Sequence, residues 1–295
     1  MPRTEKHPLD QQLDRVWPSV RGSWAFGRFL VLGHRCAVAR SVLAQAGAAL
    51  ALTLTQFNAS AAHAASPVSL TSGFYVDPSS SPAVWVAANP GDGRAGAINA
   101  SIAKTPMARW FGSWSGTIGT ATGAYVGAAA YSSKLPILVA YNIYGRDACG
   151  GQSAGGAGSS AYNTWIAAFA GGIASRPAVV ILEPDALGDY SCMSASQITD
   201  HQNMLIGGIT QLNAQAPNAW TYLDAGNPGW IAATTMAQHL DAAGLRNAHG
   251  FALNVSNYYT TTQNASYASA INSYLSSHYG YTKPFVVDTG RAVLA

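Results

Sequence analysis

Four aspartates follow short apolar segments of this sequence, at places where a buried strand would open to solvent. They are Asp147, Asp185, Asp224 and Asp288. Hydrolysis of a glycosidic bond requires one carboxylic acid that protonates the leaving oxygen and a second carboxylate that activates water or attacks carbon. Four carboxyl groups at the ends of strands could supply both functions.

Asp185 is the strongest candidate for the acid, because it lies three residues after the apolar segment 178–182. A carboxyl group stays protonated near neutral pH when it is partly desolvated or close to a second negative charge. The position of Asp185 fits the first condition, and Asp147 could supply the second. Each aspartate taken alone could equally cap the helix that follows it. Four of them at one rim favour a reactive site.

The chain also holds eight tryptophans and fourteen tyrosines, more than a core of this size needs. The apolar face of a sugar ring packs on aromatic side chains, while its hydroxyl groups bond to polar ones. Aromatic residues beside or just after the polar strand ends are Trp85, Trp110, Trp114, Tyr141, Trp230 and Tyr258. Packing in the core is the alternative for any one of them, and it is the role we expect for Trp165 and Trp220.

Short apolar segments alternate with alanine-rich helical segments after residue 72. We expect strands at residues 110–114, 136–141, 178–182, 220–223, 250–255 and 284–287, and helices at residues 96–108, 123–133, 161–174, 196–214, 229–243 and 265–279. Segments such as 178–182 are apolar throughout, which is typical of parallel strands covered on both faces. The sequence therefore predicts a parallel α/β sheet.

Polar residues at nearly every strand end favour a barrel over an open sheet. Besides the four aspartates, they include Asn142, Glu183, Asn254, Ser256 and Asn257. A barrel gathers all its carboxyl-end loops around one mouth, whereas an open sheet gathers only the loops at its switch point. Asn257 is a candidate for binding sugar hydroxyl groups. The Gly- and Ser-rich residues 150–160 are expected to form a mobile loop beside the site.

Charged residues make up only 10% of the chain, which favours a surface solvated by neutral polar groups and is typical of an extracellular protein. Residues 1–64 carry seven basic and three acidic side chains, so the remainder is nearly neutral and offers no basic surface for nucleic acid. No G-x-G-x-x-G segment follows a strand and no Walker segment is present, so no nucleotide or other cofactor is predicted.

Residues 1–64 are predicted to be a leader and secretory signal peptide, and residues 65–295 the folded domain. An arginine-containing segment precedes the Ala- and Leu-rich residues 41–64, which end in Ala62-His63-Ala64, a sequence of the form that signal peptidase cleaves. The apolar part at 42–54 is short for a bilayer, and a membrane anchor is the alternative. We therefore expect a secreted, extracellular protein without a membrane anchor after cleavage, acting as a monomer.

Loss of the leader would remove Cys36 and leave Cys149 and Cys192 as the two thiols of the chain. An even pair in an exported protein indicates one disulfide, and two unpaired buried cysteines are the alternative. The two sulfurs have neither a Cys-x-x-C spacing nor a neighbouring pair of histidines. No metal site is predicted from them.

Four motifs, in order and spacing, resemble glycoside hydrolase family 6, the inverting cellobiohydrolases and endoglucanases. They are Tyr141-Asn-Ile-Tyr-Gly-Arg-Asp147, Ile181-Leu-Glu-Pro-Asp185, Tyr222-Leu-Asp224-Ala-Gly and Val287-Asp-Thr-Gly-Arg291. The resemblance extends from about Phe74 to Arg291. It implies a distorted, TIM-like parallel α/β barrel with seven strands in the family and about six here, acting on cellulose, cello-oligosaccharides or related β-1,4-glucans.

By position, the resemblance implies that Asp185 is the general acid and that Asp147 raises the pKa of that acid. It implies that Tyr141 forces the sugar at the cleavage point out of its relaxed chair. It also implies a disulfide between Cys149 and Cys192. Four further residues are expected to contact the substrate, and they are Trp110, Trp230, Asp224 and Ser153. Two departures are Ala148, between Asp147 and Cys149, and Asn227, where many relatives carry histidine.

The sequence after Arg291 matches nothing in the family, whose members continue to a loop that holds the proposed catalytic base. We therefore expect residues 65–295 to be a catalytic domain that is incomplete at its C-terminus, with impaired hydrolysis. A non-catalytic glucan-binding protein that uses Trp110 and Trp230 is one alternative. A truncated remnant without function, which does not fold stably, is another.

Overall fold

The computed structural model describes residues 66–150 and 155–291, so the predicted leader lies outside the described residues. Within this part of the chain, six parallel strands form one sheet in the order β1-β2-β3-β4-β5-β6. Their bounds are β1 Arg109–Phe111, β2 Ile137–Ala140, β3 Ala178–Leu182, β4 Ala219–Asp224, β5 Gly250–Leu253 and β6 Phe285–Val287. Each of the six strands overlaps a segment expected from the sequence, although β1 ends at Phe111 where the expected segment runs to residue 114.

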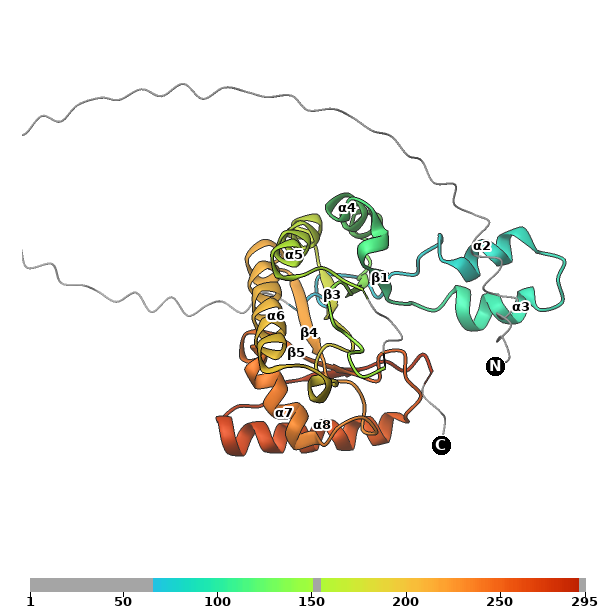
Figure 1. Cartoon of the computed structure of the whole chain (residues 1–295). Helices are drawn as coiled ribbons and strands as arrows, with labels where there is room; N and C mark the ends of the chain where they lie inside the picture. Colours follow the sequence, from blue (N-terminus) through green and yellow to red (C-terminus); the bar gives the residue numbers. More distant parts are fainter. Residues whose placement is uncertain (1–65, 151–154, 292–295) are drawn as a thin grey trace, which may run out of the picture. The chain divides into compact units, whose positions relative to one another are not determined.

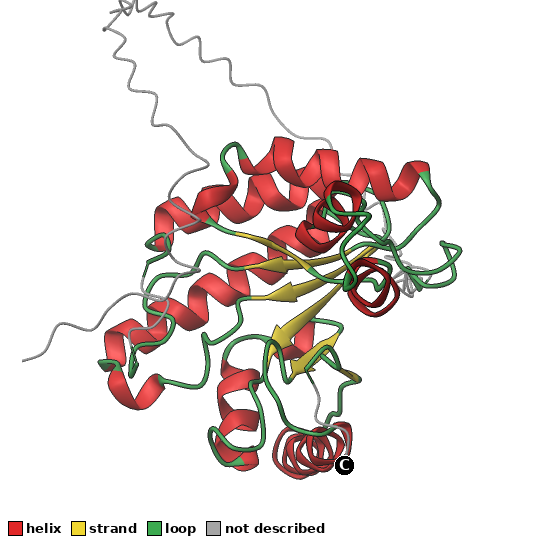
Figure 2. Cartoon of the chain, turned by 90° about the vertical axis from the view of Figure 1, so that its right-hand side faces the viewer, coloured by secondary structure: helices red, strands yellow, loops and turns green. Residues whose placement is uncertain are grey.

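Helices that connect the strands pack along one face of the sheet, whereas α2, which precedes β1, lies beside α3 (Ala95–Ile98) and away from the sheet (Figures 1 and 2). The helices of eight residues or more are α2 Ser81–Ala88, α4 Ile118–Tyr131, α5 Ser159–Ile173, α6 Ala195–Gln215, α7 Ala233–Ala242 and α8 Thr261–Tyr279. Each of the helices from α4 to α8 lies between two consecutive strands. Every connection between neighbouring strands therefore crosses over through a helix.

The sequential strand order favours a barrel-type sheet. A doubly wound sheet reverses direction at a switch point, which places its first strand in the middle of the order. In this chain β1 and β6 lie at the two ends of the described sheet, and each strand pairs with the next one in the sequence. This is the order of strands in an α/β barrel, as the sequence predicts.

Alternate residues along the strands contribute to two separate cores. Leu138, Val180 and Leu182 face the helices and join the larger core. On the opposite face, Tyr141, Ile181 and other strand residues form a smaller cluster, whose members are Val139, Tyr141, Ile181, Tyr222 and Ala252. Strands β2 and β3 are apolar throughout because both their faces are covered. Trp165 and Trp220, expected in the core, are partly buried against these two clusters.

Two elements near the start of the described chain differ from the expectation. The helix expected over 96–108 is shorter: it consists of α3, Ala95–Ile98, and a π-helical turn, Asn99–Ala103. The helix α2 was not predicted, because its eight residues include no buried side chain and therefore give no apolar periodicity. Pro82 at the first turn of α2 is a start signal that the sequence does contain.

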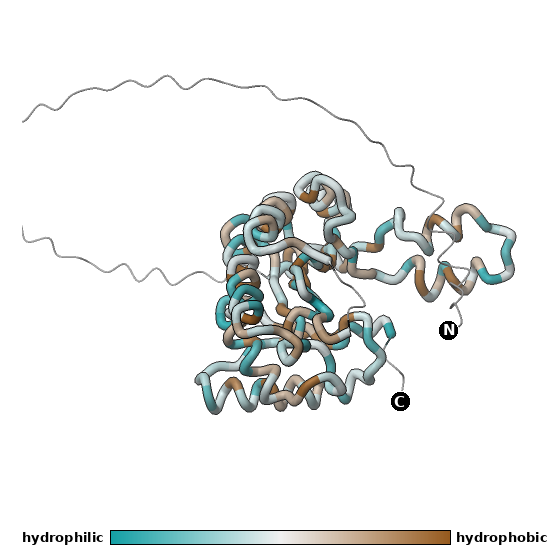
Figure 3. The backbone as a smooth tube through the Cα atoms, in the orientation of Figure 1, coloured by the Kyte–Doolittle hydropathy of each residue, from teal (hydrophilic) through white to brown (hydrophobic). Residues whose placement is uncertain are grey.

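No helix in the described part of the chain is long and apolar enough to cross a membrane. Figure 3 shows short apolar and polar stretches alternating along the helices. This pattern is typical of helices that bury one face against a sheet.

Candidate active site

The turns that follow the strands place several polar residues in unusual backbone conformations. Asp147, Glu183, Asp185, Asn254 and Ser256 all have positive φ angles, between 49° and 70°. A residue other than glycine in this region costs on the order of 1–3 kcal/mol and persists only where the surrounding structure imposes it. Such residues concentrate at functional sites, and here all five follow β2, β3 or β5 at the carboxyl end of the sheet.

Asp185 lies in the centre of this group. The hydroxyl group of Tyr141 donates a hydrogen bond to Asp185 Oδ2 over 2.9 Å. The pKa of Asp185 is raised, mainly by burial, and the negative charges of Asp147 and Asp189 raise it further. The hydrogen bond from Tyr141 and the positive charge of Arg146 oppose this rise in pKa. Both conditions expected from the sequence are therefore present, and burial is the larger one.

Asp224, the last residue of β4, lies directly beside Asp185. Its Oδ2 accepts hydrogen bonds from the backbone N–H of Asp185, at 3.3 Å, and of Gly226, at 3.1 Å. The side chain is buried, and burial followed by the charge of Asp185 raises the pKa of Asp224 to about 8. Asp224 is thus hydrogen-bonded to the backbone of Asp185, and Asp147 lies close enough for its charge to act on Asp185.

Glu183, directly after β3, stabilises the backbone next to Tyr141. It was not assigned to the site from the sequence. Its carboxyl group accepts hydrogen bonds from the backbone N–H groups of Asn142, at 2.8 and 3.0 Å, and of Ile143, at 2.9 Å. These bonds fix the chain directly after Tyr141. Burial raises the pKa of Glu183 to about 7, although the two backbone donors lower it. The sequence signal that could have assigned Glu183 to the site is its position two residues before Asp185.

Aromatic and cationic groups surround the ring of Tyr141. The Arg146 guanidinium carbon lies 4.0 Å from its centroid. Trp110 packs edge-on against Tyr141 with centroids 5.0 Å apart, and Trp114 lies at 6.4 Å. Arg146 is buried and donates to the carbonyl oxygen of Ile143 at 2.9 Å, which holds it in this position. These contacts fix the direction of the Tyr141 hydroxyl group toward Asp185.

Trp230 packs against the backbone at Gly188 and Gly226, in the turns after β3 and β4. Its Nε1 donates to Asp189 Oδ1 over 3.0 Å, and the other oxygen of Asp189 accepts from the backbone N–H of Cys149 at 3.0 Å. Cys149 and Cys192 form the predicted disulfide. Sequence reasoning placed Trp230 at the site but not Asp189, although Asp189 is one of only ten carboxylates after residue 64.

Two other predicted residues make local contacts, and one lies outside the description. Asp288 accepts from the backbone N–H groups of Ser256 and Gly290, at 2.9 and 2.8 Å, and so stabilises the loops after β5 and β6. Asn257 Oδ1 accepts from the backbone N–H of Tyr258 at 3.0 Å. Ser153 lies outside the described residues.

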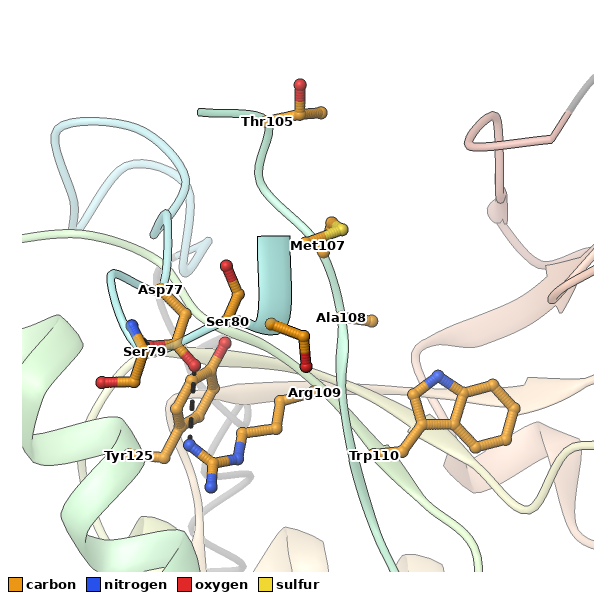
Figure 4. A pocket seen from close by; sticks show the side chains of 10 residues that line it. Asp77, Ser79, Ser80, Thr105, Met107, Ala108, Arg109, Trp110 and Tyr125 are labelled. Carbon is orange, nitrogen blue, oxygen red and sulfur yellow. Dashed lines mark hydrogen bonds and ion pairs between the residues drawn. The ribbon is translucent and has the colours of Figure 1, made fainter. Parts of the chain in front are cut away.

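A hollow of about 320 Å³ beside β1 is lined by residues that include Trp110. Figure 4 shows Arg109 and Trp110 extending to opposite sides of the strand, with Arg109 directed toward Asp77 and Tyr125. The Arg109 and Asp77 side chains form an ion pair at 3.5 Å. The carboxyl groups of the site do not line this hollow. Among the described residues, no group of three or more His, Cys, Asp or Glu could hold a metal ion.

Comparison with known proteins agrees with this geometry. Buried carboxyl groups beside aromatic rings, at the carboxyl end of a parallel α/β sheet, are the arrangement of a glycoside hydrolase. The chain belongs to glycosyl hydrolases family 6, whose family model matches residues 70–294. The resemblance inferred from the four sequence motifs is therefore confirmed.

Similar proteins include several endoglucanases. The chain is 67% identical to Endoglucanase 1 of Streptomyces halstedii over 242 residues, which cover 82% of this chain and 75% of that protein. It is 45% identical to Endoglucanase A of Thermobispora bispora over 222 residues, 74% of this chain and 48% of the relative. Among solved structures, the Mycobacterium tuberculosis endoglucanase Cel6, in complex with a methyl-cellobiosyl-thio-cellobioside, aligns with a TM-score of 0.68 and 35% identity. That alignment covers 76% of this chain and 74% of the other.

Proposed function

We propose that this chain hydrolyses β-1,4-glucosidic bonds in cellulose or related β-glucans, with Asp185 as the general acid. The observation that carries the proposal is the half-buried Asp185 carboxyl group, hydrogen-bonded to Tyr141 and adjacent to Asp224, in a family 6 chain. The endoglucanases similar to this chain, and the cellobioside bound to one of them, support the choice of substrate.

The proposed mechanism begins with the protonated form of Asp185. Because its pKa is raised, Asp185 retains a proton that it donates to the leaving glycosidic oxygen. Water attacks the anomeric carbon from the opposite face of the sugar ring, which inverts the configuration, and the proton that this water loses passes to the solvent. Asp147 disfavours loss of the proton from Asp185 in the free enzyme.

Substrate contacts are assigned to the residues around the acid. The Tyr141 ring lies against the reacting sugar and distorts it, and the rings of Trp110 and Trp230 form platforms on either side of the cleavage point. Asp224, Ser153 and Asn257 bind sugar hydroxyl groups. We also propose that residues 1–64 direct secretion and that the extracellular enzyme is a monomer.

Substitution of Asp185 by Asn tests the proposal. The amide cannot donate the proton, so D185N should release reducing sugar from a soluble β-1,4-glucan about 10²–10⁴-fold more slowly than wild type. Asp92→Asn, in the turn after α2, is the matched control and should retain full activity. Equal rates for D185N and wild type would refute the assignment, and glucan binding without any hydrolysis by wild type would indicate a non-catalytic binding protein.

A further inference from the structure

Asp189 connects three parts of the site without being one of the residues assigned to substrate or acid. It is buried, with 5% of its surface exposed. One carboxyl oxygen accepts from the indole N–H of Trp230, and the other accepts from the backbone N–H of Cys149, both at 3.0 Å. Since a carboxylate accepts and does not donate, these two donors complement its two oxygens.

The Trp230 ring is held by its neighbours as well as by this hydrogen bond. A Cβ atom at Gly188 would lie 2.3 Å from atoms of the Trp230 ring, and one at Gly226 would lie 2.8 Å from it. The indole therefore packs directly on the backbone at two glycines. Gly188 lies in the turn after β3, and Gly226 lies in the turn after β4. Asp189 follows Gly188 and fixes the rotation of the ring within this space.

The second oxygen of Asp189 connects to the loop that carries Asp147. Cys149 lies two residues after Asp147, and its disulfide partner Cys192 donates its backbone N–H to the carbonyl oxygen of Asp189 at 2.9 Å. Asp189 is thus bonded on both sides to the disulfide-linked segment. A shift of Asp189 would move Trp230 and the Asp147 loop together.

Asp189 also lies close enough to Asp185 to affect its ionisation. The charged and polar groups that face Asp185 are Asp147, Asp189, Asp224, Arg146 and Tyr141. The charges of Asp147 and Asp189 both raise the pKa of Asp185, whereas Arg146 and Tyr141 lower it. Asp189 therefore acts in the same direction as Asp147.

We propose that Asp189 is a positioning residue that holds the Trp230 platform and the Asp147 loop in register with Asp185, and that places a second negative charge beside the acid. The inference rests on the proposed function and extends it. It implies that the sugar beyond the cleaved bond and the proton donor are aligned through one carboxylate.

The test compares D189N with W230F and with the control D92N. In the pH dependence of kcat/KM on a soluble β-1,4-glucan, D189N should move the alkaline limb to lower pH by about half a unit or more, because one negative charge is lost. W230F retains an aromatic ring and both charges, so it should raise KM and leave the limb in place. D92N should change neither quantity.

A second measurement does not depend on activity. In a ¹⁵N-tryptophan spectrum, the indole resonance that is missing from W230F belongs to Trp230, and in wild type its N–H should exchange slowly with solvent. D189N should speed this exchange at least about tenfold while retaining a cooperative melt. An unmoved alkaline limb, or an unchanged exchange rate, would overturn the proposal. A wild type that hydrolyses no glucan would instead refute the proposed function, and the exchange measurement would still decide the position of Asp189.

Discussion

At the scale of single residues, the chemistry depends on how the groups around Asp185 balance its ionisation. Burial, Asp147 and Asp189 raise the pKa of Asp185, and Tyr141 and Arg146 lower it. From the sequence, Asp185 was predicted as the acid and Asp147 as its charged neighbour, because both follow apolar segments. The sequence could not predict the contributions of Tyr141, Arg146 and Asp189 to the pKa of Asp185, which depend on side-chain directions in the two loops after β2 and β3.

The Tyr141 hydrogen bond allows a prediction with the opposite sign to that for Asp189. Tyr141→Phe removes the donor that stabilises the Asp185 carboxylate, so the pKa of Asp185 should rise. The alkaline limb of kcat/KM should therefore move to higher pH, while the ring contacts with Trp110 and Arg146 are retained. pH–rate profiles of Y141F and wild type would check this, and a shift of the limb to lower pH would contradict it.

At the scale of elements, the positions of all six strands were predictable, whereas α2 was missed and the helix expected over 96–108 was longer than the one observed. Strands such as β2 and β3 are continuous apolar segments, a pattern that burial on both faces produces directly. The α2 helix contains no buried side chain, and α3 ends after four residues, so neither carries the apolar periodicity that identifies a helix. Positive φ angles at Glu183 and Asp185 are likewise imposed by tertiary contacts and have no signal in the sequence.

The start of α8 offers a test at this scale. Thr260 and Gln263 form a capping box, in which each side chain accepts from the other residue's backbone N–H, at 3.2 and 2.9 Å. Thr260→Ala should lower the free energy of unfolding by about 1 kcal/mol. Urea unfolding at neutral pH measures it, with Thr261→Ala, one residue further on and outside the cap pair, as the control. Equal losses for the two variants would show that the cap contributes nothing specific.

At the scale of the whole molecule, buried carboxyl groups make stability depend on pH in an unusual direction. The folded-state pKa values of Glu183, about 7, and Asp224, about 8, lie above their ordinary values near 4. At pH values between the ordinary pKa and the folded-state pKa, each group therefore keeps a proton in the folded state that it has lost in the unfolded state. This contribution to stability is complete in acid and is lost as pH rises toward about 8. Burial lowers the pKa values of His201 and His239, which opposes the trend below about pH 6.5.

Asp224→Asn isolates one of these groups. The amide does not titrate, so between about pH 5 and pH 8 wild type should lose up to about 1.4 kcal/mol of unfolding free energy per pH unit more than D224N. Urea unfolding at several pH values across this range would check the difference. Parallel pH profiles for the two proteins would show that Asp224 titrates normally in the folded state.

The central claim is that Asp185 donates the proton to the leaving oxygen. Its most direct test is the rate of D185N on two substrates: cellotetraose, whose leaving sugar needs a proton, and β-cellobiosyl fluoride, whose leaving fluoride needs it far less. We predict that D185N loses about 10²-fold or more relative to wild type on cellotetraose, and less than about tenfold on the fluoride. Equal losses on both substrates, or no loss on cellotetraose, would contradict the account.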